Sequence, residues 1–141
     1  MAAFNKFNQF AEDLGDGVHN LQAAGDTLRV YLSNAAPSAS ADLVKTDLAE
    51  IAAGNGYTAG GQDVANDYTE SAGVGTLVGT DVVITASGGT IGPFRYVVLY
   101  NDTPTSPADP LTGWWDYGSA ITLNDGETFT IDFGASILTV S

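Results

Sequence analysis

The feature that most constrains the fold is a stretch of alternating side chains in residues 92–133. Within it, residues 94–100 place apolar side chains on both faces of an extended chain, with Arg95 expected near a strand end or in a pair. Residues 128–133 instead alternate apolar Phe129, Ile131 and Phe133 with polar residues, which is typical of a half-buried antiparallel strand. This half of the chain is therefore predicted to form a β-sheet core.

Turn and loop signals separate further strands. Asn124-Asp125-Gly126 between two apolar runs favours a tight hairpin, and three prolines in Thr103–Pro110 indicate a surface loop. Alternation also predicts strands at residues 27–33, 81–85 and 137–140, for about seven strands altogether. The expected fold is mainly β, a β-sandwich or jelly-roll-like antiparallel domain with a short N-terminal helix.

The N-terminal segment has the clearest helical spacing in the chain. Apolar residues recur every three or four positions from Phe4 to Leu21, and glycines predict that the helix ends near Leu14. We therefore divide the chain into a helix or arm at residues 1–24 and a single β-sandwich domain at residues 25–141. The helix either packs on its own sheet or forms an arm in which Phe4, Phe7 and Phe10 dock on a neighbouring subunit. A second short helix is predicted over residues 42–53.

Charge and composition narrow the class of partner. The chain has 141 residues, 17 acidic and 4 basic side chains and a formal net charge of −13. Such a chain is repelled by nucleic-acid phosphates and by anionic membrane surfaces, so neither partner is expected. It has no cysteine, and no apolar run is long enough for a signal peptide or a membrane span. Synthesis and folding in a cytoplasm are expected.

Candidate chemical groups are few, and we predict no catalytic residue, no cofactor and no metal site. His19 is the only histidine, so neither a serine triad nor a clustered zinc site is expected. A structural calcium ion is the remaining metal hypothesis. Its oxygen ligands would come from Asp63, Asn66 and Asp67, or from Asn101, Asp102 and Asp109.

Two adjacent tryptophans leave a third hypothesis open. Neighbouring residues on a strand face opposite sides, so Trp115 and Tyr117 are expected on one face and Trp114 on the other. We expect one tryptophan in the core and the other covered by a loop or a partner. The alternative is a platform on which sugar rings stack.

Several blocks of the sequence, in this order, resemble a group of small virion structural proteins of tailed bacteriophages. They are AAFNKFNQFAEDLGDGVHNL, DTLRVYLSNAAP, IAAGNGYTAGG, ASGGTIGPFRYVVLYND and WWDYGSAITLNDGETFTIDF. The resemblance covers nearly the whole chain, lies in scaffold blocks and carries no functional residue with it.

The resemblance implies a non-enzymatic capsid decoration or cement protein, a small β-rich domain made in the host cytoplasm and added to the shell in many copies. Its implied partners are the major capsid protein, copies of itself, or both, on the outer capsid surface. The alternatives are a tail, head–tail joining or fibre component and, third, a polysaccharide-binding module. The residues expected at the interface are Phe4, Phe7, Phe10 and Trp114.

Overall fold

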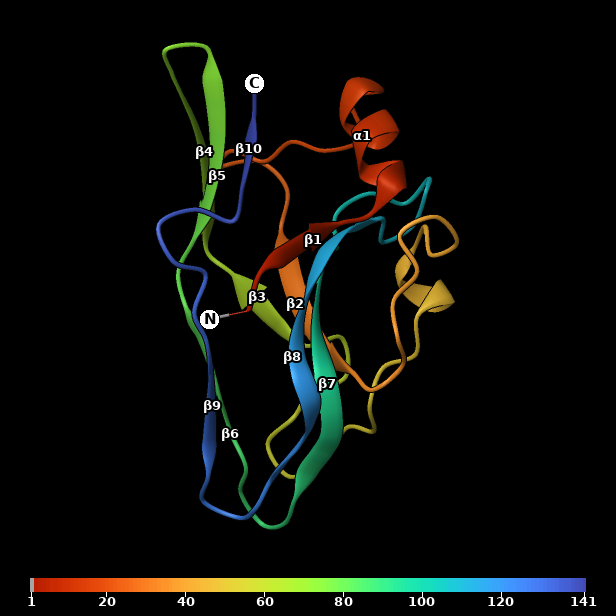
Figure 1. Ribbon diagram of the computed structural model, residues 1–141, viewed down its shortest axis with the longest axis vertical. Helices are drawn as coiled ribbons and strands as arrows, with labels where there is room; N and C mark the ends of the chain where they lie inside the picture. The colour runs from red at the N-terminus through yellow and green to blue at the C-terminus, as the bar shows by residue number, and fades with distance from the viewer. Residues whose placement is uncertain (1) are drawn as a thin grey trace.

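The computed structural model describes residues 2–141 and shows a mainly β, sandwich-like domain with one short α-helix near its N-terminus (Figure 1). One layer is a five-stranded antiparallel sheet in the order β1-β8-β7-β2-β3. Its strands are β1 (Phe4–Lys6), β2 (Leu28–Ser33), β3 (Gln62–Val64), β7 (Ile91–Asn101) and β8 (Leu111–Leu123). The long strands β7 and β8 pair at the centre of this layer and contain much of the alternating stretch at residues 92–133.

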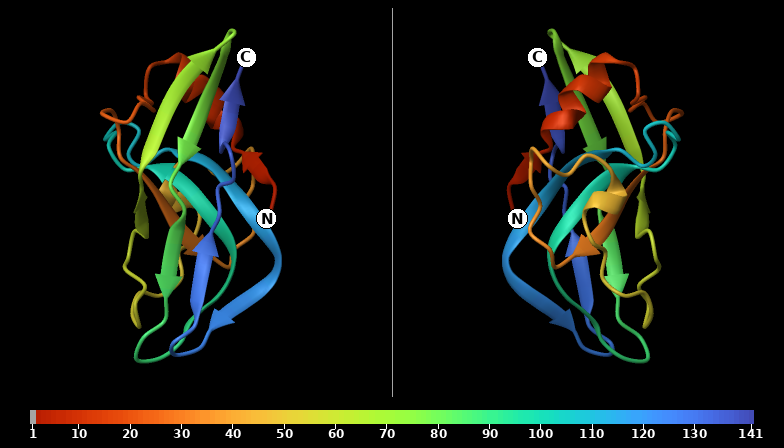
Figure 2. Two further views of the ribbon diagram at one scale, coloured as in Figure 1. Left: turned by 90° about the vertical axis from the view of Figure 1, so that its left-hand side faces the viewer. Right: turned by 90° about the vertical axis from the view of Figure 1, so that its right-hand side faces the viewer.

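The second layer is a long, narrow ribbon made of two small antiparallel sheets (Figure 2). One has the order β10-β5-β4 and the other pairs β6 with β9. Since β5 runs on into β6, and β9 leads to β10, the two sheets follow one another along the same ribbon. Their strands are β4 (Asn66–Ser71), β5 (Val74–Gly79), β6 (Val82–Thr85), β9 (Thr128–Ile131) and β10 (Leu138–Val140).

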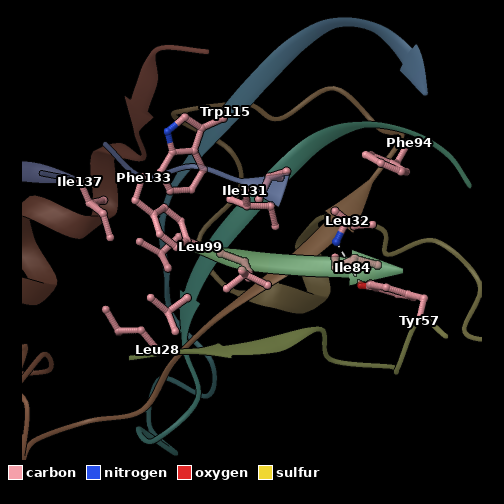
Figure 3. Packing of buried hydrophobic residues seen from close by; sticks show 14 of the residues in the cluster. Leu28, Leu32, Tyr57, Ile84, Phe94, Leu99, Trp115, Ile131, Phe133 and Ile137 are labelled. Carbon is pink, nitrogen blue, oxygen red and sulfur yellow. Dashed lines mark hydrogen bonds between the residues drawn. The ribbon is translucent and has the colours of Figure 1, made fainter. Parts of the chain in front are cut away.

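The main core lies between the two layers. Leu28 and Leu32 of β2, with Leu99 of β7, face Ile84 and Ile131 of the ribbon, and all five side chains are buried (Figure 3). This inward placement of alternate residues confirms the strands predicted at residues 27–33, 81–85 and 128–133. Burial of these apolar side chains is the main stabilising contribution to the fold.

A second buried cluster covers the opposite face of the five-stranded sheet. Tyr31, Val98, Tyr100 and Leu111 lie there beneath the segment that follows β2. Strand β7 is therefore covered on both faces, as its sequence predicted. Alternation along residues 27–33 turns Tyr31 away from the main core, yet its side chain is fully buried because the segment after β2 folds back over it.

A β-bulge changes one face assignment in β7. The alternation places Phe94 with Tyr96 and Val98, but Phe94 packs in the main core while the other two belong to the second cluster. The pairing of β7 with β8 shifts register between Phe94 and Tyr96. An extra residue in one strand reverses the facing of the residues beyond it, which sequence alternation alone does not reveal.

The N-terminal segment differs from its predicted helix. Helix α1 spans Asn8–Gly15, and the three residues Phe4–Lys6 form the edge strand β1 instead. Pairing with β8, in which Phe4 lies opposite Trp115, holds this part of the chain extended. The division at residue 24 thus separates two segments that share one sheet. No helix within residues 2–141 has the length and apolarity needed to cross a membrane.

Two other local predictions are also corrected. Residues 124–127 do form a turn, with Gly126 at a positive φ of 87°, but this turn leads from β8 in one layer to β9 in the other. It is therefore not the predicted hairpin between paired strands. The helix predicted over residues 42–53 is reduced to one 3₁₀ turn, Lys45–Asp47. Residues around it instead cover the second cluster as irregular chain.

Candidate functional site

The aromatic residues proposed for an interface do not form a shared surface. Phe7 is 0% exposed and Phe10 is 2% exposed, so both are held within the chain itself and neither offers area to a neighbour. Phe7 belongs to the second cluster and Phe10 to the main core. Both rings are covered by the chain itself, and the N-terminal segment packs on its own sheet, which is one of the two arrangements that the sequence left open.

The same aromatic residues fasten the N-terminal segment to β8. The ring of Phe4 packs edge-on against Trp115 with 5.2 Å between ring centroids, and Phe7 packs against Trp114 at 4.6 Å. Pairs of this geometry add stability beyond the area they bury. Phe4 and Trp114 remain half-buried, so they are the two members of the predicted set with some surface left for contact.

Trp114 and Trp115 lie on opposite faces of β8, as predicted. Trp115 is 3% exposed in the main core, with Tyr117 packed against the same cluster. Trp114 packs against the second cluster and lies over Phe7. Because the two rings face opposite sides of the sheet, they do not make one continuous stacking platform for a sugar chain.

The carboxylates considered for calcium are not gathered into a site. Asp63 pairs with Arg29 at 2.9 Å, the Asn66 amide donates to the carbonyl oxygen of Leu21, and Asp67 accepts from the backbone of residues 23 and 68. Within residues 2–141, no three or more Asp, Glu, His or Cys side chains come together in a manner suited to a metal ion.

Of the second group of calcium candidates, Asn101, Asp102 and Asp109, only the two carboxylates lie next to one another. Burial, with the adjoining Asp102 carboxylate, raises the pKa of Asp109 above its usual range. The third member, Asn101, is fully buried at the end of β7 and its amide is used in hydrogen bonds to His19 and Asp26. The pair therefore supplies two carboxyl groups, fewer than the six to eight oxygens that calcium takes.

Residues 45–60 contain a polar cluster that the sequence did not predict. Glu50 accepts hydrogen bonds from Lys45 at 2.9 Å, from the Tyr57 hydroxyl at 2.6 Å and from the Gly60 backbone at 2.8 Å. The Lys45 ammonium also lies over the ring of Tyr31, 4.8 Å from its centroid. This cluster ties the irregular segment after β2 to the outer face of the five-stranded sheet.

Ionisation in this cluster is set by its contacts. Burial alone would raise the pKa of Glu50, but hydrogen bonds from Tyr57, Lys45 and Gly60 outweigh it and hold that pKa below its usual range. Burial and the bond to Glu50 raise the pKa of Tyr57 above its usual range. Glu50 is therefore a carboxylate and Tyr57 a neutral phenol near neutral pH. Both are fully engaged, which suits a structural clamp better than acid–base chemistry.

Most of the acidic surface has no counter-charge within the chain. Three of the four basic side chains are paired in residues 2–141: Arg29 with Asp63, Lys45 with Glu50, and Arg95 with Asp116. The Arg95 pair confirms the expectation that this residue is paired. The remaining carboxylates far outnumber the cations, so the molecule presents a strongly negative surface to any partner.

Unpaired strand edges are the main feature available for association. β1 and β3 end the five-stranded sheet, and β10 and β4 end the three-stranded one, with no further strand beside them in residues 2–141. The hairpin of β4 and β5 also projects beyond the body of the domain (Figure 1).

Comparisons of the chain with protein families, with curated proteins and with solved structures find no match.

Proposed function

We propose that this chain is a non-enzymatic structural protein of a tailed-phage virion, and specifically a decoration or cement protein on the outer surface of the capsid. The observation that carries the proposal is the combination of a strongly negative surface with unpaired strand edges on a two-layered β domain. Strand edges associate with other proteins through backbone hydrogen bonds. Its partners are then the major capsid protein, further copies of the chain, or both.

The charge supports an outward position. A protein with a net charge of −13 on the inner side of the shell would face densely packed DNA phosphates, which repel it. On the outer side the same charge keeps a protein of high local concentration soluble.

The polar clusters support a structural role. The ring nitrogen of His19 that faces the amide of Asn101 is hydrogen-bonded, and Glu50 is held by three donors. Each group holds one part of the chain against another. Contacts of this kind hold irregular segments in place, as a structural domain requires.

Labelling of intact virions tests the proposal. A short epitope inserted at the exposed β4–β5 turn, between Ala72 and Gly73, keeps both strands paired and is read by a gold-tagged antibody in electron micrographs. Label distributed over the capsid is the expected result. Label confined to the tail, the head–tail joint or fibres identifies the alternative structural role, and no label on intact or disrupted particles refutes both.

A further inference from the structure

A buried polar cluster connects the N-terminal segment to the end of β7. His19 lies in the connection between α1 and β2 and is 7% exposed, and Asn101, the last residue of β7, is 0% exposed. The Asn101 amide nitrogen lies 3.0 Å from His19 Nδ1 and 2.7 Å from an oxygen of Asp26. The three side chains thus bridge segments that are far apart in the sequence.

The orientation of the Asn101 amide is fixed by two independent partners. Its Oδ1 accepts a hydrogen bond from the backbone N–H of Thr103 at 3.2 Å, a group that only donates. Its Nδ2 donates to the Asp26 carboxylate, a group that only accepts when ionised. The atom that faces His19 is therefore the NH₂ donor.

This orientation fixes the tautomer of His19. Because the amide donates, Nδ1 of the imidazole must accept with its lone pair, and the ring proton of the neutral form must be on Nε2. The Nδ1 lone pair is already used, so this nitrogen is not free to bind a metal ion or to take a proton from a substrate while the contact holds.

Protonation of the ring is incompatible with this contact. A proton on Nδ1 would place two donors, N–H of the imidazolium and N–H of Asn101, against one another at 3.0 Å. Asn101 has no simple way to reverse its amide, since both of its other contacts would then be lost. The ring must therefore move when it takes up a proton.

We propose that His19 is an acid-sensitive latch, in which proton uptake at Nδ1 breaks the bond to Asn101 and loosens residues 16–26 from the end of β7. The segment that loosens includes the support of Phe10, whose ring lies 5.0 Å from the His19 ring between centroids. Above the titration range of the ring, the latch is closed.

The groups around His19 set the direction of the response. Asp13 faces it from α1 and Asp26 from the connection before β2, whereas β4 contributes the phenol of Tyr68 and β10 the apolar Val140 to the same shallow cavity. Burial lowers the pKa of His19 below its usual value, and the two carboxylates oppose this only in part. The unfolded chain therefore binds the proton more readily, and the stabilising contribution of neutral His19 is complete above about pH 6.5 and is lost as the pH falls below it.

The response is expected to be local rather than global. The 16–26 connection keeps other contacts when the latch opens, including the bond from the Asn66 amide to the Leu21 carbonyl oxygen at 2.7 Å. The strands of the two sheets stay paired without the histidine, and the main core is affected only where Phe10 and Leu21 join it.

Nuclear magnetic resonance of the full chain tests the latch directly, because His19 gives the only histidine signal. At pH 7.5 the ring ¹⁵N shifts are expected to show the Nε2–H tautomer. Between pH 7.5 and 5.5 the amide protection factors of residues 16–26 are expected to fall about tenfold, while those of β7 and β8 stay constant. An Nδ1–H tautomer at pH 7.5, or a titrating ring with unchanged protection, overturns the proposal.

A substitution separates His19 from the surrounding carboxylates. In His19→Asn the side-chain oxygen stands near the position of Nδ1 and accepts from Asn101 without titrating, so the protection of residues 16–26 is expected to become independent of pH in this range. Glu12→Gln, which removes an exposed carboxylate from α1, is the matched control and should keep the wild-type response. A persistent acid response in His19→Asn contradicts the latch. If that variant does not fold, the tautomer and protection of the wild-type chain still decide.

Discussion

Replacement of Trp115 by alanine tests whether the two layers are held together as described. The indole lies in the main core of β8, with ring centroids 5.2 Å from Phe4 and 5.4 Å from Phe133. Through Phe4 it holds the edge strand β1 against β8, and through Phe133 it joins the five-stranded sheet to the ribbon (Figure 3 shows Trp115 beside Phe133). Its removal is expected to weaken both contacts at once.

The expected loss can be worked out from the area that the ring buries. A tryptophan buries on the order of 150–250 Å², which at about 25 cal/mol per Å² gives an upper limit of about 4–6 kcal/mol. Truncation of a core aromatic residue to alanine costs about 3–5 kcal/mol in practice. We expect Trp115→Ala to lower the free energy of unfolding by about 4 kcal/mol and Tm by roughly 10–20 °C for a domain of this size.

Thermal and urea unfolding of the wild type, Trp115→Ala and Trp114→Ala measure the effect. Trp114 is half-buried over Phe7, so its truncation is expected to lower the free energy of unfolding by only about 1–2 kcal/mol. The urea m-value should change little if the domain still unfolds in one transition. Equal losses for the two variants, or a smaller loss for Trp115→Ala, would refute the assignment of Trp115 to the main core.

Three further predictions rest on single contacts or single segments. Gly61→Ala should lower Tm strongly or prevent folding, because Gly61 has a φ of +81° and the added methyl group would collide with the backbone carbonyl of Val30 in β2. Gly118→Ala, at a similar φ of +86° but with open space around the added methyl group, is the control in calorimetry. Glu50→Gln should lower the free energy of unfolding at pH 7 by about 1–3 kcal/mol in urea titrations. Folding lowers the pKa of Glu50, so the stabilisation from its carboxylate is present above about pH 4.3 and is lost as the pH falls through the folded pKa. The free energy of unfolding of the variant should therefore fall less steeply with decreasing pH than that of the wild type. An equally steep fall in both argues against the clamp. Deletion of residues 1–10 should give an expanded or aggregating chain in light scattering, since it removes two buried rings; a stable folded product would show that the segment is a dispensable arm.

Predictions based on the alternation of neighbouring side chains were the reliable ones. It located β2, β6 and β9 because each buries one face against the main core, and it placed Trp114 and Trp115 on opposite sides of β8. Such facing depends only on the two-residue period of a strand, which is a property of neighbouring residues.

Features that depend on distant partners were missed. Phe4 and Phe7 have helical spacing, but pairing of residues 4–6 with β8 overrides it, so that the helix begins only at Asn8. The bulge before Tyr96 is likewise a property of two paired strands, and the sequence of one strand alone does not predict it.

The candidate site shows the same division. A lone histidine predicts neither a serine triad nor a zinc cluster, but the contact of His19 with Asn101, 82 positions away, has no signal in the sequence. The sequence does not predict the Glu50 cluster, because the helical spacing of residues 42–53 predicts a helix where the chain forms only one 3₁₀ turn. The glycines on both sides of Tyr57, at positions 54, 56, 60 and 61, indicate an irregular chain there but not its contact with Glu50.

The most direct test of the proposed virion role is the copy number of this chain relative to the major capsid protein in purified particles. Quantitative mass spectrometry with isotope-labelled peptides of both chains gives this ratio. A decoration protein is expected at a fixed ratio to the major capsid protein, in numbers comparable to the hundreds of shell subunits. A handful of copies per particle would assign the chain to the tail or the head–tail joint. Absence from purified particles would contradict the account.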